Sequence, residues 1–325
     1  MRLDGHDPAA VERAAAALAA GELVAFPTET VYGLGARADD DAAVAQIFAR
    51  KGRPSEHPLI VHVAEAADAL AFTEVMPPIA HRLMDAFWPG PLTVIVPRAD
   101  AIARAAAGGQ SSVGLRCPAH PVAQALLRAA RKLGVPGVAA PSANRFGRIS
   151  PTQADHVASE FGPDLWLLDG GACEVGIESS IVDCTRGRAA LLRPGVLTRE
   201  RIEAAAGVRL DAPDPQAPRA SGTLESHYAP HATLRLMATP MLRTALELLG
   251  ELPPELAVYS RTVRPRVIGP RYRPMPDKPR QAAFDLFATL RELDADGVRL
   301  IWVEEPPPGP EWDGVRDRLQ RAAAR

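Results

Sequence analysis

Helical and strand-like segments alternate along this chain of 325 residues, and the alternation restricts its fold more than any other feature. Asp7-Pro8 predicts the start of a helix that stops at Gly21, and the apolar residues 23–26 predict the strand that follows it. The same order recurs toward residue 207, which is typical of an α/β sheet with flanking helices. Several later strands follow one another without a helix between them, so we expect the sheet to be mixed.

The apolar periodicity and the turn residues between segments assign most of the first 207 residues to elements. Helices are expected over residues 9–20, 40–50, 78–87, 119–132, 153–160 and 199–206, and strands over 23–26, 59–63, 92–96, 113–116 and 137–140 and near 165, 181 and 191.

A proline-rich segment separates this region from the rest of the chain. Residues 211–219 contain three prolines and no apolar periodicity, which predicts a semi-rigid linker. Because the chain exceeds the usual size of one domain, we expect a larger domain at 1–207, a linker at 208–231 and a smaller α/β domain at 232–325. The expected strands of this smaller domain are 234–237, 256–259 and 299–303, and its expected helices are 241–249, 281–293 and 312–324.

Charge and cysteine content exclude some classes of protein. The 37 lysines and arginines against 39 aspartates and glutamates give a formal charge of -2, which argues against a general nucleic-acid binder and limits any RNA contact to a local patch. Cys117, Cys173 and Cys184 are odd in number and lack CxxC spacing, so neither a disulfide framework nor a zinc site is indicated. With no leader-like start and no long apolar run, we expect a cytoplasmic protein.

Two cations lie close together after a predicted helix. Lys51 and Arg53 flank Gly52, and cations so placed suit the oxygens of a triphosphate. A basic helix C-terminus that complements the macrodipole is an equally good interpretation. The nearby Gly33 and Gly35 match neither the dinucleotide fingerprint nor the Walker loop, and a turn explains them equally well.

His62 and Arg116 each end a predicted strand. A histidine in this position is more often a structural residue than a ligand, unless other polar groups converge on it. An arginine at a strand end of an α/β sheet faces the crevice in which ligands bind. We therefore expect Arg116 to bind a substrate carboxylate, with a surface ion pair as the alternative.

Hydroxyl and amide side chains gather in turns near other strand ends. Pro141-Ser-Ala-Asn144 and Ser150-Pro-Thr152 contain residue types that more often cap helices and build turns than bind ligands. Two such clusters in one loop favour a ligand site. Residues 176–183 and 192–195 add further hydroxyls and a cation.

The chain contains no GxSxG, no HExxH and no Cys–His arrangement with an orienting residue, so nucleophilic hydrolysis and zinc catalysis are poorly supported. Cations and hydroxyls without an obvious nucleophile favour phosphoryl or nucleotidyl transfer, in which positioning and charge stabilisation supply most of the catalysis.

Taken in order, seven segments resemble the YrdC/Sua5 family of threonylcarbamoyl-AMP synthases in its long, two-domain form. They are Pro27-Thr-Glu-Thr-Val-Tyr-Gly-Leu-Gly35, Lys51-Gly-Arg-Pro54, His57-Pro-Leu-Ile-Val-His62, Trp88-Pro-Gly-Pro-Leu-Thr93, Pro141-Ser-Ala-Asn144, Ser150-Pro-Thr152 and Arg193-Pro-Gly195. The resemblance covers residues 1 to about 207, and Ser226-His-Tyr-Ala-Pro230 and Asp317-Arg-Leu-Gln-Arg-Ala-Ala323 give a looser match beyond.

The resemblance implies a twisted mixed YrdC-like sheet followed by a Rossmann-like C-terminal domain. It implies condensation of L-threonine, bicarbonate and ATP to L-threonylcarbamoyladenylate and diphosphate, for the t6A modification of tRNA at position 37. A separate tRNA threonylcarbamoyl transferase complex would receive the product. Mg²⁺ would accompany ATP without an assigned protein ligand.

Residue by residue, the resemblance implies two sets of contacts. Threonine would be held by Thr30, His62, Arg116, Ala140 and Ser180. ATP would be surrounded by Lys51, Arg53, His57, Ser112, Ser142, Asn144, Ser150 and Arg193, with Lys51 and Arg53 as the catalytic cations. The linker would act as a water-excluding lid through His227 and Tyr228. Its segment 220–230 starts differently from that of many relatives and has no basic residue before His227, which argues against a cationic role for this segment and leaves His227 and Tyr228 as the expected lid contacts to the nucleotide.

Two other classes compete with this interpretation. Residues 261–280 hold six arginines and Lys278 against Asp277, which would suit an RNA-binding module, although a solvated proline-rich loop explains the run at least as well. Aromatic interleaving there is limited to Tyr272. Carbamoyl transfer of the hydrogenase-maturation type would require zinc-finger and acylphosphatase-like regions, which the sequence does not contain.

Overall fold

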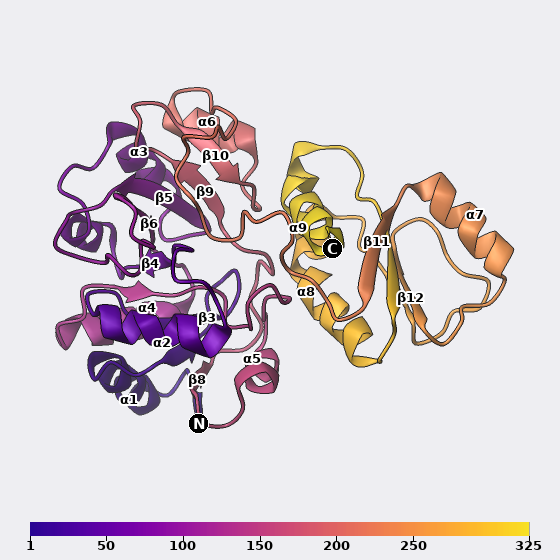
Figure 1. Ribbon diagram of the computed structural model, residues 1–325, viewed down its shortest axis with the longest axis horizontal. Coiled ribbons are helices and arrows are strands. Elements are labelled where there is room, and N and C mark those ends of the chain that lie inside the picture. The colour runs from indigo at the N-terminus through magenta and orange to yellow at the C-terminus, as the bar shows by residue number, and fades with distance from the viewer. Residues whose placement is uncertain (325) are drawn as a thin grey trace. The chain divides into compact units, whose positions relative to one another are not determined.

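The computed structural model describes residues 1–324, and these divide into two compact units (Figure 1). The first unit comprises residues 1–146 and 150–223. The second comprises residues 147–149 and the chain from Leu224 onward. Each unit is described by itself.

The first unit is built on a twisted mixed sheet, as expected. Within the described residues its strand order is β1-β8-β2-β3-β7-β4-β6-β5-β9-β10. In chain order the strands are β1 Arg2–Asp4, β2 Val24–Phe26, β3 Gly33–Arg37, β4 Ile60–His62, β5 Leu92–Pro97, β6 Ser112–Arg116, β7 Val138–Ala139, β8 Trp166–Asp169, β9 Ser180–Asp183 and β10 Ala190–Arg193. β4 and β6 pair in parallel, whereas β5 pairs antiparallel with β6.

The helices of the first unit begin and end close to the expected positions. They are α1 Pro8–Ala19, α2 Asp41–Lys51, α3 Pro78–Phe87, α4 Pro121–Lys132, α5 Ala154–Phe161 and α6 Arg199–Ala206, with a 3₁₀ helix, η1, at Ala66–Ala71. The caps explain the boundaries. The Asp7 side chain accepts a hydrogen bond from the Ala9 amide, and Gly52 closes α2 in the left-handed conformation at φ 64°.

Alternation along the strands divides the apolar side chains between the two faces of this sheet. Val24 and Phe26 of β2 pack with α1 and α4, whereas Ala25 between them belongs to the cluster that contains α2, α3 and α6. A third cluster forms where Ile60, Ile95 and Ile181 pack against Ala217 and Ala220. On that part of the sheet, the linker supplies the apolar cover that helices supply elsewhere.

The second unit contains a four-stranded parallel sheet in the order β11-β14-β12-β13. Its elements are β11 Thr233–Met237, α7 Thr239–Leu249, β12 Leu256–Ser260, β13 Tyr272–Pro274, α8 Pro279–Ala295, β14 Leu300–Glu304, η2 Pro310–Trp312 and α9 Asp313–Ala323. Leu242 and Leu246 of α7 pack on Val258 of β12, and α8 and α9 lie across the sheet from α7 (Figure 1). The expected Rossmann-like α/β layering is confirmed.

Among residues 1–324, no helix has both the length and the apolar character that a membrane span requires.

A buried carboxylate joins the strand ends of the second unit. Glu304, the last residue of β14, accepts hydrogen bonds from the amides of Arg261 and Thr262 at 2.6 and 2.7 Å. It also accepts from the hydroxyls of Thr239 and Ser260 at 2.8 and 3.0 Å, and from that of Thr262. Burial alone would raise the pKa of Glu304, but the hydrogen bonds outweigh it and lower the pKa to about 2.

We expect acid to loosen the loop after β12. Because the folded-state pKa of Glu304 lies below its unfolded value, its stabilising contribution is complete above about pH 4.5 and is lost as the pH falls toward 2. Hydrogen exchange at the amides of Arg261 and Thr262, corrected for intrinsic rates, should accelerate in that window. Glu304→Gln should show fast exchange already at pH 6, whereas the exposed Glu305→Gln is the control. Pronounced protection in Glu304→Gln would contradict the prediction.

Candidate functional site

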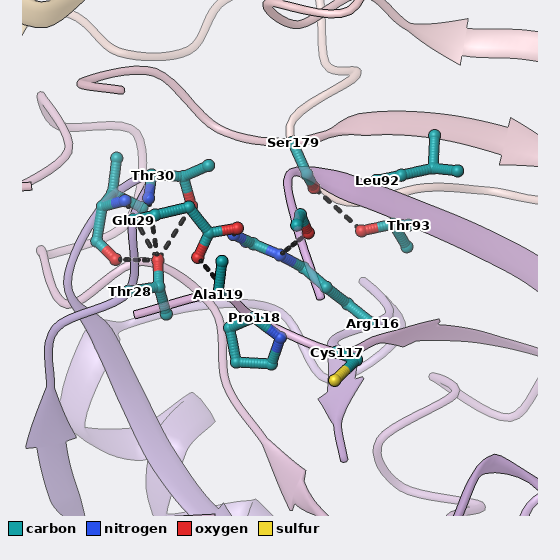
Figure 2. A network of polar contacts seen from close by, with 12 residues as sticks. Thr28, Glu29, Thr30, Leu92, Thr93, Arg116, Cys117, Pro118, Ala119 and Ser179 are labelled. Atoms are coloured by element: carbon teal, nitrogen blue, oxygen red, sulfur yellow. Dashed lines mark hydrogen bonds and ion pairs between the residues drawn. The ribbon is translucent and has the colours of Figure 1, made fainter. Parts of the chain in front are cut away.

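A buried ion pair lies at the end of β6. Nη2 of Arg116 is 2.7 Å from Oε1 of Glu29, and the two side chains are only 4% and 6% exposed. Oε2 of Glu29 accepts a hydrogen bond from the Ala119 amide at 3.0 Å, and Nε of Arg116 donates to the Gly90 carbonyl at 3.3 Å (Figure 2). The alternative of a surface ion pair is therefore wrong. Nη1 of Arg116 makes no hydrogen bond within residues 1–324.

His62 lies beside Arg116 because β4 and β6 pair in parallel with these two residues in register. Its ring is buried and meets the Phe26 ring edge-on, with 6.2 Å between centroids. Burial, and then the positive charge of Arg116, lower the pKa of His62 to about 3. His62 is therefore neutral near pH 7, and its Nδ1 has no hydrogen-bond partner in the described part of the chain.

Ser180 presents a second buried polar atom without a partner, its Oγ, among residues 1–324. The segment Gly90-Pro91 connects this atom to the ion pair, because Gly90 accepts from Arg116 and the Pro91 carbonyl accepts from the Ser180 amide at 3.1 Å. Buried polar groups in proteins are nearly always hydrogen-bonded. His62 Nδ1 and Ser180 Oγ have no hydrogen-bond partner in the described chain, and both lie on strands around the buried Arg116. They therefore indicate a site for a polar ligand.

The hydroxyl of Thr30 is oriented by its own turn. Thr28 Oγ1 donates to the Val31 carbonyl at 2.6 Å and lies 2.8 Å from Thr30 Oγ1. A hydroxyl has one proton, so Thr30 must be the donor in the contact between the two threonines. The remaining lone pairs of Thr30 Oγ1 can only accept from a ligand. Ala140 is buried, and its amide donates to the Ile60 carbonyl at 2.9 Å.

The segment Arg193-Pro-Gly195 packs against Ser179 and Ser180. Arg193 donates through Nε and Nη2 to the Ser179 carbonyl at 3.0 and 2.9 Å, and through Nη1 to the Ser221 carbonyl at 2.8 Å. A Cβ built on Gly195 would lie 2.6 Å from the Ser180 amide nitrogen and 2.8 Å from its Oγ. The glycine is thus required by the close approach of the two backbones.

We expect Gly195→Ala to displace Ser180. The added methyl group cannot fit without a backbone shift, so ligand affinity at the Ser180 hydroxyl should fall, with a loss of stability of about 1–3 kcal/mol. Thermal unfolding and calorimetric titration of L-threonine measure the two effects. Gly269→Ala is the matched control, because a Cβ there meets no atom within 4 Å. Unchanged threonine affinity in Gly195→Ala would count against the assignment of Ser180.

Lys51 is the last residue of α2, and its buried ammonium reaches another loop. Nζ donates to the Ser142 carbonyl at 2.6 Å and to the Asn144 carbonyl. Burial, and then Arg53, lower the pKa of Lys51 well below its usual value. Lys51 therefore fixes the Pro141-Ser-Ala-Asn144 turn in addition to any role toward a ligand.

Arg53 and His57 gather around one aromatic ring. The guanidinium of Arg53 lies 5.6 Å from the Phe146 ring centroid, and the His57 ring is at 5.4 Å from the same centroid. Arg53 also donates to the Pro58 carbonyl at 3.0 Å. Burial, and then the charge of Arg53, lower the pKa of His57. The loop after α2 is thus held as a compact cationic and aromatic cluster.

The remaining expected nucleotide contacts lie on the same unit. Ser112 begins β6 and lines a pocket with Ile60, Thr93, Gly114 and the linker residues 219–221. Asn144 Nδ2 donates to the Arg145 carbonyl at 2.7 Å, and Ser150 donates to Glu178. In contrast, His227 and Tyr228 belong to the second unit, where the Tyr228 ring packs on Phe287 at 5.5 Å and under the Arg318 guanidinium at 5.4 Å. Their role as lid contacts stays a prediction.

Gly33 and Gly35 form neither a turn nor a phosphate loop. They lie in β3, and a Cβ on Gly35 would come within 2.7 Å of Val138 Cγ1 and 2.8 Å of the Phe26 ring. Interpreting this pair as a turn is therefore wrong, because close packing between strands requires the glycine.

Sequence reasoning missed three side chains that orient the site. Glu29 pairs with Arg116, and Thr93 and Ser179 share a hydroxyl contact of 2.8 Å beside Arg193 (Figure 2). Glu29 lies within the Pro27–Gly35 motif and Ser179 is next to Ser180, so their positions in the motifs were the available signal. Their partners are 86 or 87 residues away, beyond local patterns.

Metal-binding residues do not cluster in the described chain. No group of three or more His, Cys, Asp or Glu side chains in residues 1–324 is arranged to hold a metal ion. The three cysteines are buried and free.

This chain is an α/β protein with a buried arginine, and polar atoms without hydrogen-bond partners in the described residues lie on the strands around it. Two family models match the chain: "Telomere recombination" over residues 16–195 and "Threonylcarbamoyl-AMP synthase, C-terminal domain" over residues 197–324. The chain belongs to the Sua5/YciO/YrdC family.

Relatives of known name cover most of the chain. A threonylcarbamoyl-AMP synthase of Pyrococcus abyssi is 37% identical over 316 residues, which are 93% of this chain and 91% of that protein. One of Bacillus subtilis is 44% identical over 240 residues, 72% of this chain and 68% of that protein. The crystal structure of P. abyssi Sua5 complexed with L-threonine is similar with a TM-score of 0.88 and 34% identity, covering 99% of this chain and 96% of that one.

Proposed function

We propose that this chain is a threonylcarbamoyl-AMP synthase, a nucleotidyltransferase that converts L-threonine, bicarbonate and ATP to L-threonylcarbamoyladenylate and diphosphate. One observation carries the proposal: Nη1 of the buried Arg116 has neither a hydrogen bond nor an ion pair in the described chain, and the arginine lies in register with His62, whose Nδ1, like Ser180 Oγ, has no hydrogen-bond partner there. The named relatives, including one solved with L-threonine, support the same substrate.

Threonine offers a carboxylate, an amine and a hydroxyl, and the site has a matching group for each. Arg116 supplies the charged donor that a carboxylate requires. Thr30 Oγ1 has only acceptor capacity left, which suits an amine or a hydroxyl proton. The neutral His62 and Ser180 hold unused polar atoms. Ala140 is proposed to add a backbone contact.

The proposed chemistry requires no covalent nucleophile. The amine of threonine attacks the carbon of bicarbonate, water leaves, and a carbamate forms. A carbamate oxygen then attacks the α-phosphorus of ATP, the bond to the β,γ-diphosphate breaks, and diphosphate leaves. Positive side chains near the phosphates stabilise the charge that grows on their oxygens. Lys51 and Arg53 are proposed for this role, with His57, Ser112, Ser142, Asn144, Ser150 and Arg193 around the nucleotide.

Mg²⁺ is proposed to arrive with ATP. This ion keeps several waters and is usually bound by substrate phosphates together with one or two carboxylates. When bound, it would neutralise phosphate charge. We also propose a cytoplasmic location, which the free cysteines suit, and hand-off of the adenylate to a tRNA threonylcarbamoyl transferase complex.

Release of diphosphate tests the proposal. We expect release from ATP only when L-threonine and bicarbonate are both present, together with a product of the mass of threonylcarbamoyl-AMP. ATP turnover that ignores threonine would overturn the proposal. So would tight tRNA binding without adenylate formation, the outcome that an RNA-binding module predicts. In the arginine-rich segment, Arg261 and Arg273 are already paired, with Asp277 and Glu292 respectively.

A further inference from the structure

Glu29 contacts one edge of the Arg116 guanidinium and leaves the other edge open. Its Oε1 lies 2.7 Å from Nη2, while Nε is engaged by the Gly90 carbonyl at 3.3 Å (Figure 2). The guanidinium is planar, so fixing Nε and Nη2 also fixes the direction of Nη1. Nη2 makes the ion pair with Glu29 but no hydrogen bond, whereas Nη1 has neither kind of contact in residues 1–324 and is therefore the donor left for a ligand.

Glu29 is itself held from three directions. The Ala119 amide donates to Oε2 at 3.0 Å, and the Glu29 carbonyl accepts from the Val175 amide at 2.7 Å. The residues on either side of it, Thr28 and Thr30, form the hydroxyl pair of the same turn. The carboxylate is thus a rigid support that joins the Thr30 turn to the strand end at Arg116.

Because the pair is buried, the Glu29 carboxylate fixes the orientation of the Arg116 guanidinium as well as balancing its charge. A long arginine side chain has several rotamers, and ordering it costs conformational entropy. If Arg116 is already ordered in the free protein, ligand binding does not carry this cost. Removing one partner of a buried ion pair leaves an uncompensated buried charge, which is strongly destabilising. Without the Glu29 carboxylate, the hydrogen bond from Nε to the Gly90 carbonyl would be the remaining contact that holds the guanidinium, and the direction of Nη1 would no longer be fixed.

We propose that Glu29 is the positioning residue for Arg116: it holds the Nη2 edge so that the Nη1 edge is presented to the carboxylate of the amino-acid substrate. Glu29 does not touch the substrate in this role. The inference rests on the proposed function and deepens it. Recognition of the substrate carboxylate would depend on the charge of Glu29 as well as on that of Arg116, although Glu29 does not contact the substrate.

Steady-state diphosphate release with Glu29→Gln tests the inference. The amide keeps the size of the side chain and removes its charge. We expect kcat/KM for L-threonine to fall at least tenfold, with KM for ATP changed less than twofold. L-Threoninamide lacks the carboxylate, so its kcat/KM should change less than twofold, and the preference for threonine over the amide should collapse. Glu29→Asp should recover part of that preference. Glu22→Gln, at an exposed glutamate of the same unit, is the matched control.

The possible results distinguish a positioning role of Glu29 from a purely structural one and from a failure of the proposed function. An equal fall for threonine and threoninamide would mean that Glu29 only supports the fold, and no change for either would mean that Arg116 is directed by other contacts; each result overturns the inference. If threoninamide turns over too slowly to measure, calorimetric titration of both ligands gives the same comparison. A wild-type protein without threonine-dependent diphosphate release would instead overturn the proposed function.

Discussion

Replacing Arg116 with Ala should weaken L-threonine binding at least about a hundredfold, the loss of a charge-assisted pair worth about 2–5 kcal/mol when it is buried. Arg116 is the cation at the end of β6 that has an unbonded Nη1 in the described chain. Calorimetric titration with threonine measures the change, and ATP titration should give an affinity within a few-fold of wild type.

A stability control accompanies this variant. Arg116→Ala strands the Glu29 carboxylate in a buried site, which can cost about 3–5 kcal/mol. The double variant Arg116→Ala/Glu29→Gln removes both charges and should recover most of the melting temperature but none of the threonine affinity. If threonine affinity returns together with stability, Arg116 supports the fold and does not bind the carboxylate.

Lys51→Ala should reduce kcat for diphosphate release about 10²- to 10³-fold, the size of effect seen when one donor to a developing charge is removed. The affinity for threonine should stay within a few-fold of wild type. The structure adds a second reason for a large effect, because Nζ also donates to the carbonyls of Ser142 and Asn144 and thereby fixes that turn. Single-turnover measurements with saturating substrates isolate the chemical step.

Lys132→Ala is the matched control for Lys51→Ala. Both lysines are in the last turn of a helix, but Lys132 is exposed at the end of α4. A contribution through the helix macrodipole would affect the two variants equally, by about 0.3–1 kcal/mol of stability and without a change in kcat. Similar small effects in both would show that Lys51 only complements its helix.

The position of the site follows from how the sheet is covered. α1 and α4 pack against Val24 and Phe26 of β2, whereas Ile60, Ile95 and Ile181 are packed by linker residues 217 and 220. His62, Arg116 and Thr93 lie on the strands of this second region. Strand ends that a linker covers leave room for a ligand that a packed helix would exclude.

Local signals located most elements of the chain. α3 was expected at 78–87 and is found there, because a proline starts it and apolar residues recur at helical spacing along it. β3 was missed, since Gly33 and Gly35 disfavour a strand by propensity and are tolerated only because Phe26 and Val138 fill the space of their missing side chains. β1 and β13 were missed because their short sequences, Arg-Leu-Asp and Tyr-Arg-Pro, contain no apolar run that would indicate a strand.

The sequence by itself determined the order of most elements and the family that seven ordered motifs indicate, because both depend on neighbours within one helix, strand or turn. Tertiary structure decided which groups meet. Glu29 and Arg116 are 87 positions apart, and Lys51 lies 91 positions from Ser142 and 93 from Asn144. Strand pairing sets such contacts, and a shift of one residue in register would move every side chain to the opposite face of the sheet.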